Sequence, residues 1–114
     1  ICDAHRNFPD DLMISIVRNG AEQGGGVIGI GYWDTVTCDD SPDGVARVIM
    51  AAIDVLGVDH VSLGSDYDGS VTVGFDTSDL AALTDALLRA GATEDQIRAV
   101  MGGNMMRVLR ARLN

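Results

Sequence analysis

Five segments of the chain place apolar residues at the three- and four-residue spacing of an amphipathic helix. In the second segment, Ser41 and Pro42 suit the N-cap and the first helical position, and Gly57 ends the pattern. The fourth segment begins with a capping box, Thr93-Glu94-Asp95-Gln96. The helices are expected to start near Pro9, Pro42, residues 76–78, Thr93 and Asn104, and the first is expected to end at Asn19-Gly20.

Two short apolar runs between these helices predict strands, over residues 27–33 and 60–64. The first run is continuous rather than alternating, which is typical of a strand buried on both faces, as in a parallel sheet. The two runs lie about 34 residues apart, which suits one βαβ unit with a crossover helix. Two parallel strands cannot cover their own faces and edges. The pattern therefore predicts an α/β fold and favours a piece of a larger sheet or barrel over a small helical domain.

Composition excludes several classes of protein. Hydrophobic residues make up 46 % of the chain, enough for a packed core, so a disordered chain is excluded. The net charge is −9, and all eight basic residues are Arg, so neither a nucleic acid nor an anionic membrane surface is an expected partner. No apolar run is long enough to predict a membrane-spanning helix. Cys2 and Cys38 fit no metal-ligand spacing, and two separate thiols are favoured over a disulfide.

Candidate chemistry lies just after each predicted strand, where functional groups of α/β folds gather. Tyr32-Trp33-Asp34 follows the first strand, and the glycine-flanked pair Asp66 and Asp68 follows the second. A carboxylate in this place can bind a divalent metal, act as a base on a metal-bound water, or bind a substrate ammonium group. The alternative is that both aspartates are turn residues that cap backbone amides.

The loop that begins at Asp66 can be compared with known motifs. A calcium-binding EF-hand would need Gly at its sixth position and Glu at its twelfth, where this chain has Val71 and Thr77. Residues 66–71 resemble the Asp-x-Asp-Gly-Thr motif of haloacid dehalogenase phosphatases, which also use a downstream basic residue, generally Lys. This chain has no Lys, so a magnesium-dependent phosphatase using Asp66 and Asp68 is kept as an alternative. A non-enzymatic fragment that oligomerises through open strand edges is the other.

Four blocks resemble, in order, the C-terminal part of the membrane dipeptidase (renal dipeptidase) family of zinc peptidases. They are RNFPDD at residues 6–11, GGVIGI at 25–30, VDHVSLGSDYDG at 58–69 and MGGNMMRVL at 101–109. The resemblance implies a (β/α)8 barrel, of which the two strands would be the last two. It also implies hydrolysis of dipeptides by a water that bridges two zinc ions at the C-terminal mouth of the barrel.

The resemblance carries roles onto individual residues. Arg6 matches the arginine that binds the substrate's C-terminal carboxylate. Asp66 matches the aspartate beside the zinc pair, which contacts the bridging water and the substrate's amino group. Asp68 is expected to support the loop through hydrogen bonds to its backbone. Tyr32 and Trp33 either line the pocket for a dipeptide side chain or pack in the core.

The family's zinc ligands are a His-x-Asp pair, a bridging glutamate and two later histidines, and none of the segments that carry them occurs here. His5 and His60 are interpreted as structural or surface residues, and Asn104 as a helix cap. The three methionines 101, 105 and 106 are expected in the core. Residues 1–114 are therefore expected to form the C-terminal part of a metallodipeptidase domain, without metal ligands and inactive without its N-terminal part, and a homo-oligomer is kept as an open alternative.

Overall fold

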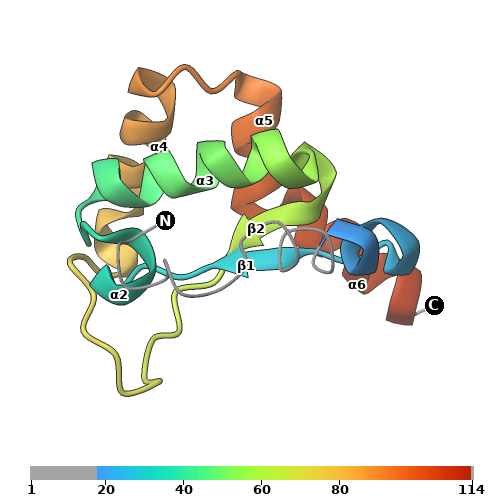
Figure 1. Ribbon diagram of the computed structural model, residues 1–114, viewed down its shortest axis with the longest axis horizontal. Helices are drawn as coiled ribbons and strands as arrows, with labels where there is room; N and C mark the ends of the chain where they lie inside the picture. The colour runs from blue at the N-terminus through green and yellow to red at the C-terminus, as the bar shows by residue number, and fades with distance from the viewer. Residues whose placement is uncertain (1–17, 114) are drawn as a thin grey trace.

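The computed structural model describes residues 18–113 of the chain. Two short parallel strands lie at its centre, and helices pack above them and at one end (Figure 1). Residues 18–24 are helical and precede the first strand. The elements that follow are β1 (Ile28–Ile30), α2 (Asp34–Thr37), α3 (Pro42–Leu56), η2 (Val58–His60), β2 (Val61–Leu63), η3 (Thr77–Asp79), α4 (Leu80–Arg89), α5 (Glu94–Arg98), η4 (Ala99–Gly103) and α6 (Asn104–Leu113).

The predicted βαβ unit is confirmed. β1 and β2 pair in parallel, with Ile28 opposite Val61, and α3 forms the crossover between them. Both strands are shorter than the apolar runs that predicted them, and Gly29 in β1 is exposed, so burial on both faces was wrong for this strand. Gly29 and Gly64 approach so closely that a Cβ on either would press on the other's backbone, which keeps the strand ends together.

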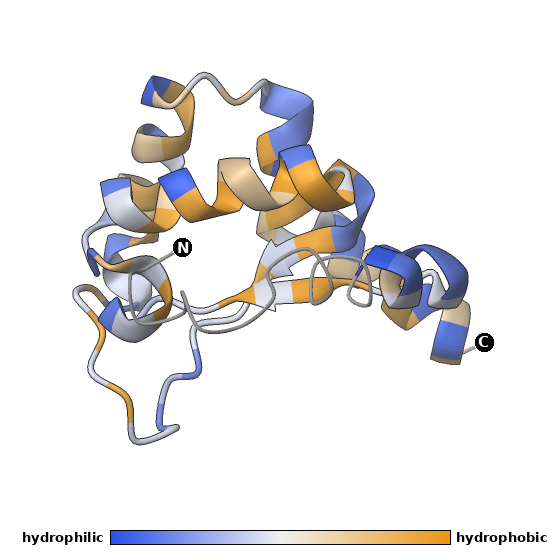
Figure 2. Cartoon of the chain, in the orientation of Figure 1, coloured by the Kyte–Doolittle hydropathy of each residue, from blue (hydrophilic) through white to orange (hydrophobic). Residues whose placement is uncertain are grey.

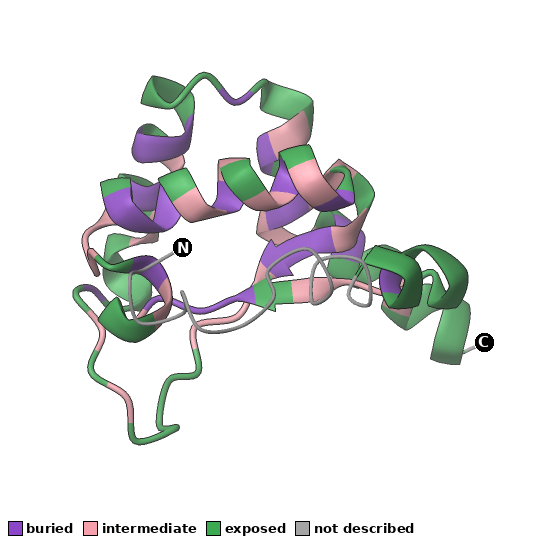
Figure 3. Ribbon diagram, in the orientation of Figure 1, coloured by how far each residue is buried: buried purple, intermediate pink, exposed green. Residues whose placement is uncertain are grey.

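One hydrophobic core joins the strands to α3, α4, α5 and η4. α3 turns its apolar side toward the strands and toward α4, as the hydropathy colouring shows (Figure 2). The burial colouring places most buried residues along this layer (Figure 3). The largest fully buried side chains are those of Tyr32, Ile49, Leu83, Leu87, Val45, Val61 and Val100.

The helix signals in the sequence are largely confirmed. The Ser41 hydroxyl accepts a hydrogen bond from the Gly44 amide, and Pro42 begins α3. The capping box of α5 is complete, because Thr93 and Gln96 each bond the other's backbone amide. Gly91, which follows α4, has a φ of 94°, a left-handed conformation that suits glycine after a helix.

One expected helix boundary was wrong, and one short helix was not predicted. The chain stays helical through residues 18–24, past the predicted stop at Asn19-Gly20, and reaches a left-handed residue only at Gly25. Ala21 is buried here, so packing of this turn outweighs the low helix propensity of glycine. The short helix α2 was not predicted, because four residues carry no helical periodicity.

The C-terminal helix also differs from its prediction. Met105 and Met106 are exposed rather than in the core, whereas Met101 is partly buried and accepts a hydrogen bond from Thr84. Asn104 does not cap α6. Its side-chain amide donates instead to the carbonyl oxygens of Val58, at 2.6 Å, and of Val61, at 2.8 Å, which ties α6 to the start of β2.

Cys38, directly after α2, is disulfide-bonded, so the preference for separate thiols was wrong. The predicted helix start at Pro9, together with His5, Arg6 and Cys2, lies outside the described residues. Within residues 18–113, every helix is too short or too polar to span a membrane.

Candidate functional site

The segments that follow β1 and β2 meet at one end of the molecule. α2 and the loop of residues 64–76 lie together there (Figure 1). Trp33 and Val73 form an antiparallel bridge between the two segments. A Cβ at Gly74 would overlap the carbonyl oxygen of Asp40, so glycine lets the loop backbone approach the segment after α2. The residues singled out after the two strands therefore lie at the same end.

Asp66 is exposed on this loop and has a left-handed φ of 56°. The Gly69 amide donates to the Asp66 carbonyl oxygen at 2.8 Å and closes a tight turn. The Asp66 carboxylate lies over the Cα of Gly69, where any Cβ would overlap it. Glycine at position 69 is thus required by the placement of the Asp66 side chain. Asp68 makes no recorded hydrogen bond to the described residues, so its expected support of the loop is not found.

Three aromatic rings form the floor beneath this turn. Tyr32 is buried and stacks on Phe75, with ring centroids 5.1 Å apart and planes 21° apart. Tyr67 meets Tyr32 edge to face at 6.0 Å. Burial, with a smaller contribution from Tyr67, raises the pKa of Tyr32 to about 12. The structure therefore brings Tyr32 to the Asp66 loop, as the base of a ring cluster that reaches the surface at Tyr67.

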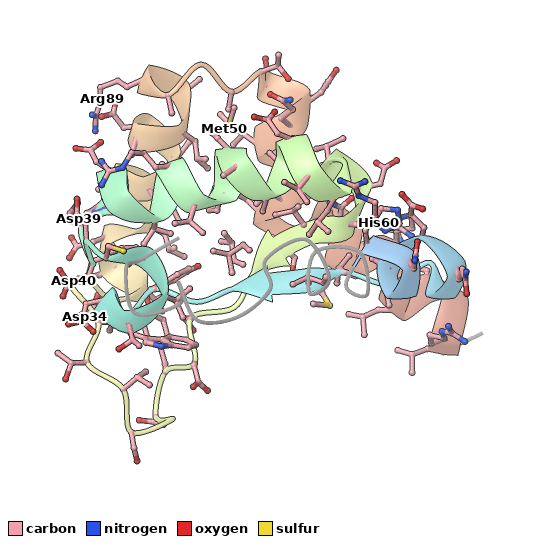
Figure 4. The ribbon with its side chains drawn as sticks, in the orientation of Figure 1. Asp34, Asp39, Asp40, Met50, His60 and Arg89 are labelled. Atoms are coloured by element: carbon pink, nitrogen blue, oxygen red, sulfur yellow. The ribbon has the colours of Figure 1, made fainter. Side chains whose placement is uncertain are left out.

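Carboxylates surround this end of the molecule. Asp34, Asp39 and Asp40 lie at the α2 end, and His60 lies toward the opposite end (Figure 4). Hydrogen bonds from Ser41, with a further one from Arg47, lower the pKa of Asp39 to about 2. Hydrogen bonds from Ser78 likewise lower the pKa of Asp76. Asp39 and Asp76 therefore remain ionised near neutral pH, which favours a cationic ligand over an anionic one at the end that carries Asp66.

The described residues do not provide a metal site. No group of three or more His, Cys, Asp or Glu side chains between residues 18 and 113 is placed to hold a metal ion. His60 directs Nδ1 to the Gly26 carbonyl oxygen at 2.9 Å, so Nδ1 carries the proton and the ring joins the turn before β1 to the start of β2. The zinc pair implied by the resemblance therefore does not fit on these residues alone.

A hollow of about 260 Å³ lies between α3 and α4, away from the loop. Its charged lining is already paired. Arg89 contacts Asp43 at 2.6 Å and Asp85 at 2.8 Å, and Arg47 contacts Asp39 at 2.9 Å. Of these three exposed pairs, Arg89–Asp43 alone joins two helices, α4 and α3, and pairs of this kind contribute little free energy. We interpret this hollow as structural.

Sequence reasoning missed the residues that hold Asp66. Tyr67 and Phe75 were not singled out, and Gly69 was noted only as a flanking glycine. The usable signal was the glycine three positions after an aspartate in a strand-end loop, which indicates a close approach of a side chain to the backbone. The contact of Tyr67 with Phe75 has no signal in the sequence, because it depends on the path of residues 68–74.

Comparison with known proteins identifies the family. The model of the membrane dipeptidases, peptidase family M19, matches residues 1–113. A dipeptidase of Aspergillus oryzae, aclJ, is 34 % identical over 117 residues, which cover 96 % of this chain and 26 % of that protein. The dipeptidase verJ of Clonostachys rogersoniana is 32 % identical over 109 residues, 91 % of this chain and 27 % of that protein. An uncharacterized dipeptidase of Schizosaccharomyces pombe is 30 % identical over 121 residues, 95 % and 27 % respectively.

These matches define the class at the level of the family, since two of these relatives are named as dipeptidases and the third as an uncharacterized dipeptidase. The chain belongs to the membrane dipeptidase family, peptidase family M19. It spans about a quarter of the length of the curated relatives that it matches. No solved structure matches it at a significant level.

Proposed function

We propose that this chain forms the C-terminal part of a zinc-dependent dipeptidase barrel and carries part of its substrate-binding site. The observation that supports this most strongly is the family match across residues 1–113, together with an exposed Asp66 at the carboxyl end of a parallel strand. Functional groups of α/β barrels lie at that end of the strands. β1 and β2 would then be the last two strands of the barrel.

Each proposed role rests on the chemistry of the side chain. The Asp66 carboxylate would accept hydrogen bonds from the amino group of a dipeptide, and the acidic surroundings of the loop support binding of a cation there. Arg6, outside the described residues, would bind the C-terminal carboxylate with its forked guanidinium. Tyr32 would form the base of the side-chain pocket, beneath Tyr67. Two zinc ions would supply the activated water, held by ligands outside residues 18–113.

This proposal predicts that the 114 residues alone hydrolyse nothing. The purified chain should leave Gly-Leu intact and should not retain two zinc ions through dialysis. Hydrolysis or tight binding of two zinc ions by the chain alone would contradict the proposal. Release of phosphate from an aryl phosphate with magnesium would support the phosphatase alternative. A sedimentation profile that changes with concentration would support an oligomerising fragment.

A chimera tests the roles of single residues. In the Aspergillus oryzae dipeptidase, the region that matches this chain, 26 % of that protein, would be replaced by this chain. We expect zinc-dependent dipeptide hydrolysis, and we expect Asp66→Asn to lower kcat/KM about 10- to 100-fold, the value of one charge-assisted hydrogen bond. Asp68→Asn is the matched control, since Asp68 is also exposed and left-handed on the same loop. Equal losses in both variants would refute the role of Asp66.

The domain assignment has its own test. The intact mass of the protein purified from its source should lie well above the 12.0 kDa of this chain if these residues are one part of a complete barrel. A mass of 12.0 kDa would contradict that assignment.

A further inference from the structure

The turn that carries Asp66 is held in an unfavourable backbone conformation. Asp66, Asp68 and Ser70 have φ values of 56°, 66° and 61°, a left-handed region that is unfavourable for residues other than glycine. Asp tolerates this region better than most residues, but three such positions within five residues persist only when the surroundings hold them. All residues from 66 to 70 are exposed, so burial does not hold them.

Tyr67 supplies the contacts that connect this turn to the rest of the molecule. Its hydroxyl donates to the Phe75 carbonyl oxygen at 3.3 Å, and its ring lies edge to face against Tyr32. Tyr32 and Phe75 are 2 % and 7 % exposed and stacked on each other, so Tyr67 is attached to a rigid base. Tyr67 itself is 37 % exposed.

Within residues 18–113, the other side chains of the turn make no comparable connection. Among the described residues, no hydrogen bond, ion pair or ring contact is recorded between the remaining side chains of residues 65–70 and any residue outside the turn. Ser65 accepts a bond from the Tyr67 amide, and the Gly69 amide bonds Asp66, both within the turn. The orientation of the Asp66 peptide unit therefore depends on its neighbour, Tyr67.

We propose that Tyr67 is the positioning residue for the Asp66 carboxylate. The contact of the Tyr67 ring with Tyr32 fixes the orientation of the turn. The hydrogen bond of the Tyr67 hydroxyl fixes the distance between the turn and residues 73–76. The effect on catalysis rests on the proposed function of Asp66, whereas the effect on the loop does not. Tyr67 acts through Asp66 and need not touch the substrate.

Backbone order parameters from nitrogen relaxation measure the loop directly. In the 114-residue chain, the amide of Gly69 should show an order parameter near that of a rigid backbone, about 0.85. Tyr67→Ala removes both contacts and should lower it below about 0.6, the flexible range. Tyr67→Phe keeps the ring and should give an intermediate value. Leu88→Ala, which truncates another exposed apolar side chain, should leave Gly69 unchanged.

The amide of Gly57, which bonds Ile53 at the end of α3, serves as the internal reference for an intact fold. The proposal is overturned if the Gly69 order parameter in Tyr67→Ala equals that of the wild type while Gly57 is also unchanged. If Tyr67→Ala does not fold, the test is the Gly69 order parameter of Tyr67→Phe compared with that of the wild type. An equal order parameter in the two proteins overturns the contribution of the hydroxyl.

The chimera gives the functional readout. Tyr67→Ala should raise KM more than it lowers kcat, since a mobile Asp66 binds the amino group less often, and Tyr67→Phe should recover most of the loss. A lower Gly69 order parameter in Tyr67→Ala, together with full activity of the Asp66→Asn chimera, would support the positioning of Asp66 by Tyr67 and refute the proposed role of Asp66. An unchanged loop would refute positioning and leave the role of Asp66 intact.

Discussion

Asn104→Ala, which removes the side-chain amide, should lower the free energy of unfolding more than almost any other truncation of a polar side chain in α6. Asn104 is 4 % exposed, and its amide donates to two carbonyl oxygens of the segment that leads into β2. In Asn104→Ala the carbonyl of buried Val61 loses this donor without gaining access to water, whereas the Val58 carbonyl keeps the Val61 amide as a donor. Each net hydrogen bond contributes about 1 kcal/mol, and an unsatisfied buried acceptor costs about 1–3 kcal/mol.

The expected loss in the free energy of unfolding is therefore about 2–4 kcal/mol. Urea unfolding followed by far-UV circular dichroism should show a lower midpoint at an unchanged slope, since the same surface is exposed on unfolding. In a thermal scan, Tm should fall by roughly 8–16 °C. Asn104→Asp replaces the donor with acceptors that face carbonyl oxygens, so it should lose at least as much.

Asn19→Ala is the matched control. Asn19 is exposed in the helical turn of residues 18–24, where alanine has the higher helix propensity, so this variant should be unchanged or slightly more stable. A free energy of unfolding for Asn104→Ala within 0.5 kcal/mol of wild type, at the precision typical of exposed substitutions, would refute the inference that these two bonds hold α6.

Three further predictions follow from single residues. Gly20→Ala should stabilise the chain by about 0.5–1 kcal/mol in urea unfolding, because the position is helical and open to a Cβ; a loss of stability would contradict the extended helix. Burial raises the pKa of Tyr32 from 10.0 to about 12, so its contribution to stability is full below pH 10 and should fall by up to about 3 kcal/mol as pH rises from 10 to 12. Unfolding midpoints measured across this pH range test the loss, and the tyrosinate absorbance of the Tyr67→Phe variant reports the titration of Tyr32. If Tyr32 were solvent-exposed, neither measurement would change between pH 10 and 12 in this way. Gly69→Ala should leave the free energy of unfolding within about 1 kcal/mol of the wild type but should displace the flexible Asp66 carboxylate. The chimera with this substitution should therefore lose dipeptide hydrolysis. Retained activity would mean that the Asp66 carboxylate does not act from the position seen here.

The features that depend on neighbouring residues could be read from the sequence. Ser41, Gly57 and the capping box at Thr93 act on amides and carbonyls within four positions, and all three lie where they were expected. The place of Asp66 could also be anticipated, because the carboxyl ends of parallel strands share one edge. The stop at Asn19-Gly20 failed because tertiary packing of Ala21 outweighed a local preference.

Contacts between distant residues could not be derived in the same way. Asn104 bonds residues 46 and 43 positions away, and only its place on the apolar stripe after Ile97 and Val100 hinted at burial. The bond from Tyr67 to Phe75 depends on the course of a loop without periodicity, so no pattern in the sequence indicates it.

The parallel pairing of β1 with β2 also sets an order of events in folding. Paired residues are 33 positions apart (61 − 28), and closing a connection of that length costs about 3 kcal/mol of chain entropy before any strand bond forms. Formation of α3 first converts half of this connection into a rod about 22 Å long. Val45 and Ile49 are then already aligned to meet the strands. The rate of folding should therefore depend on helix formation in α3, whereas changes in α6 should act mainly on the rate of unfolding.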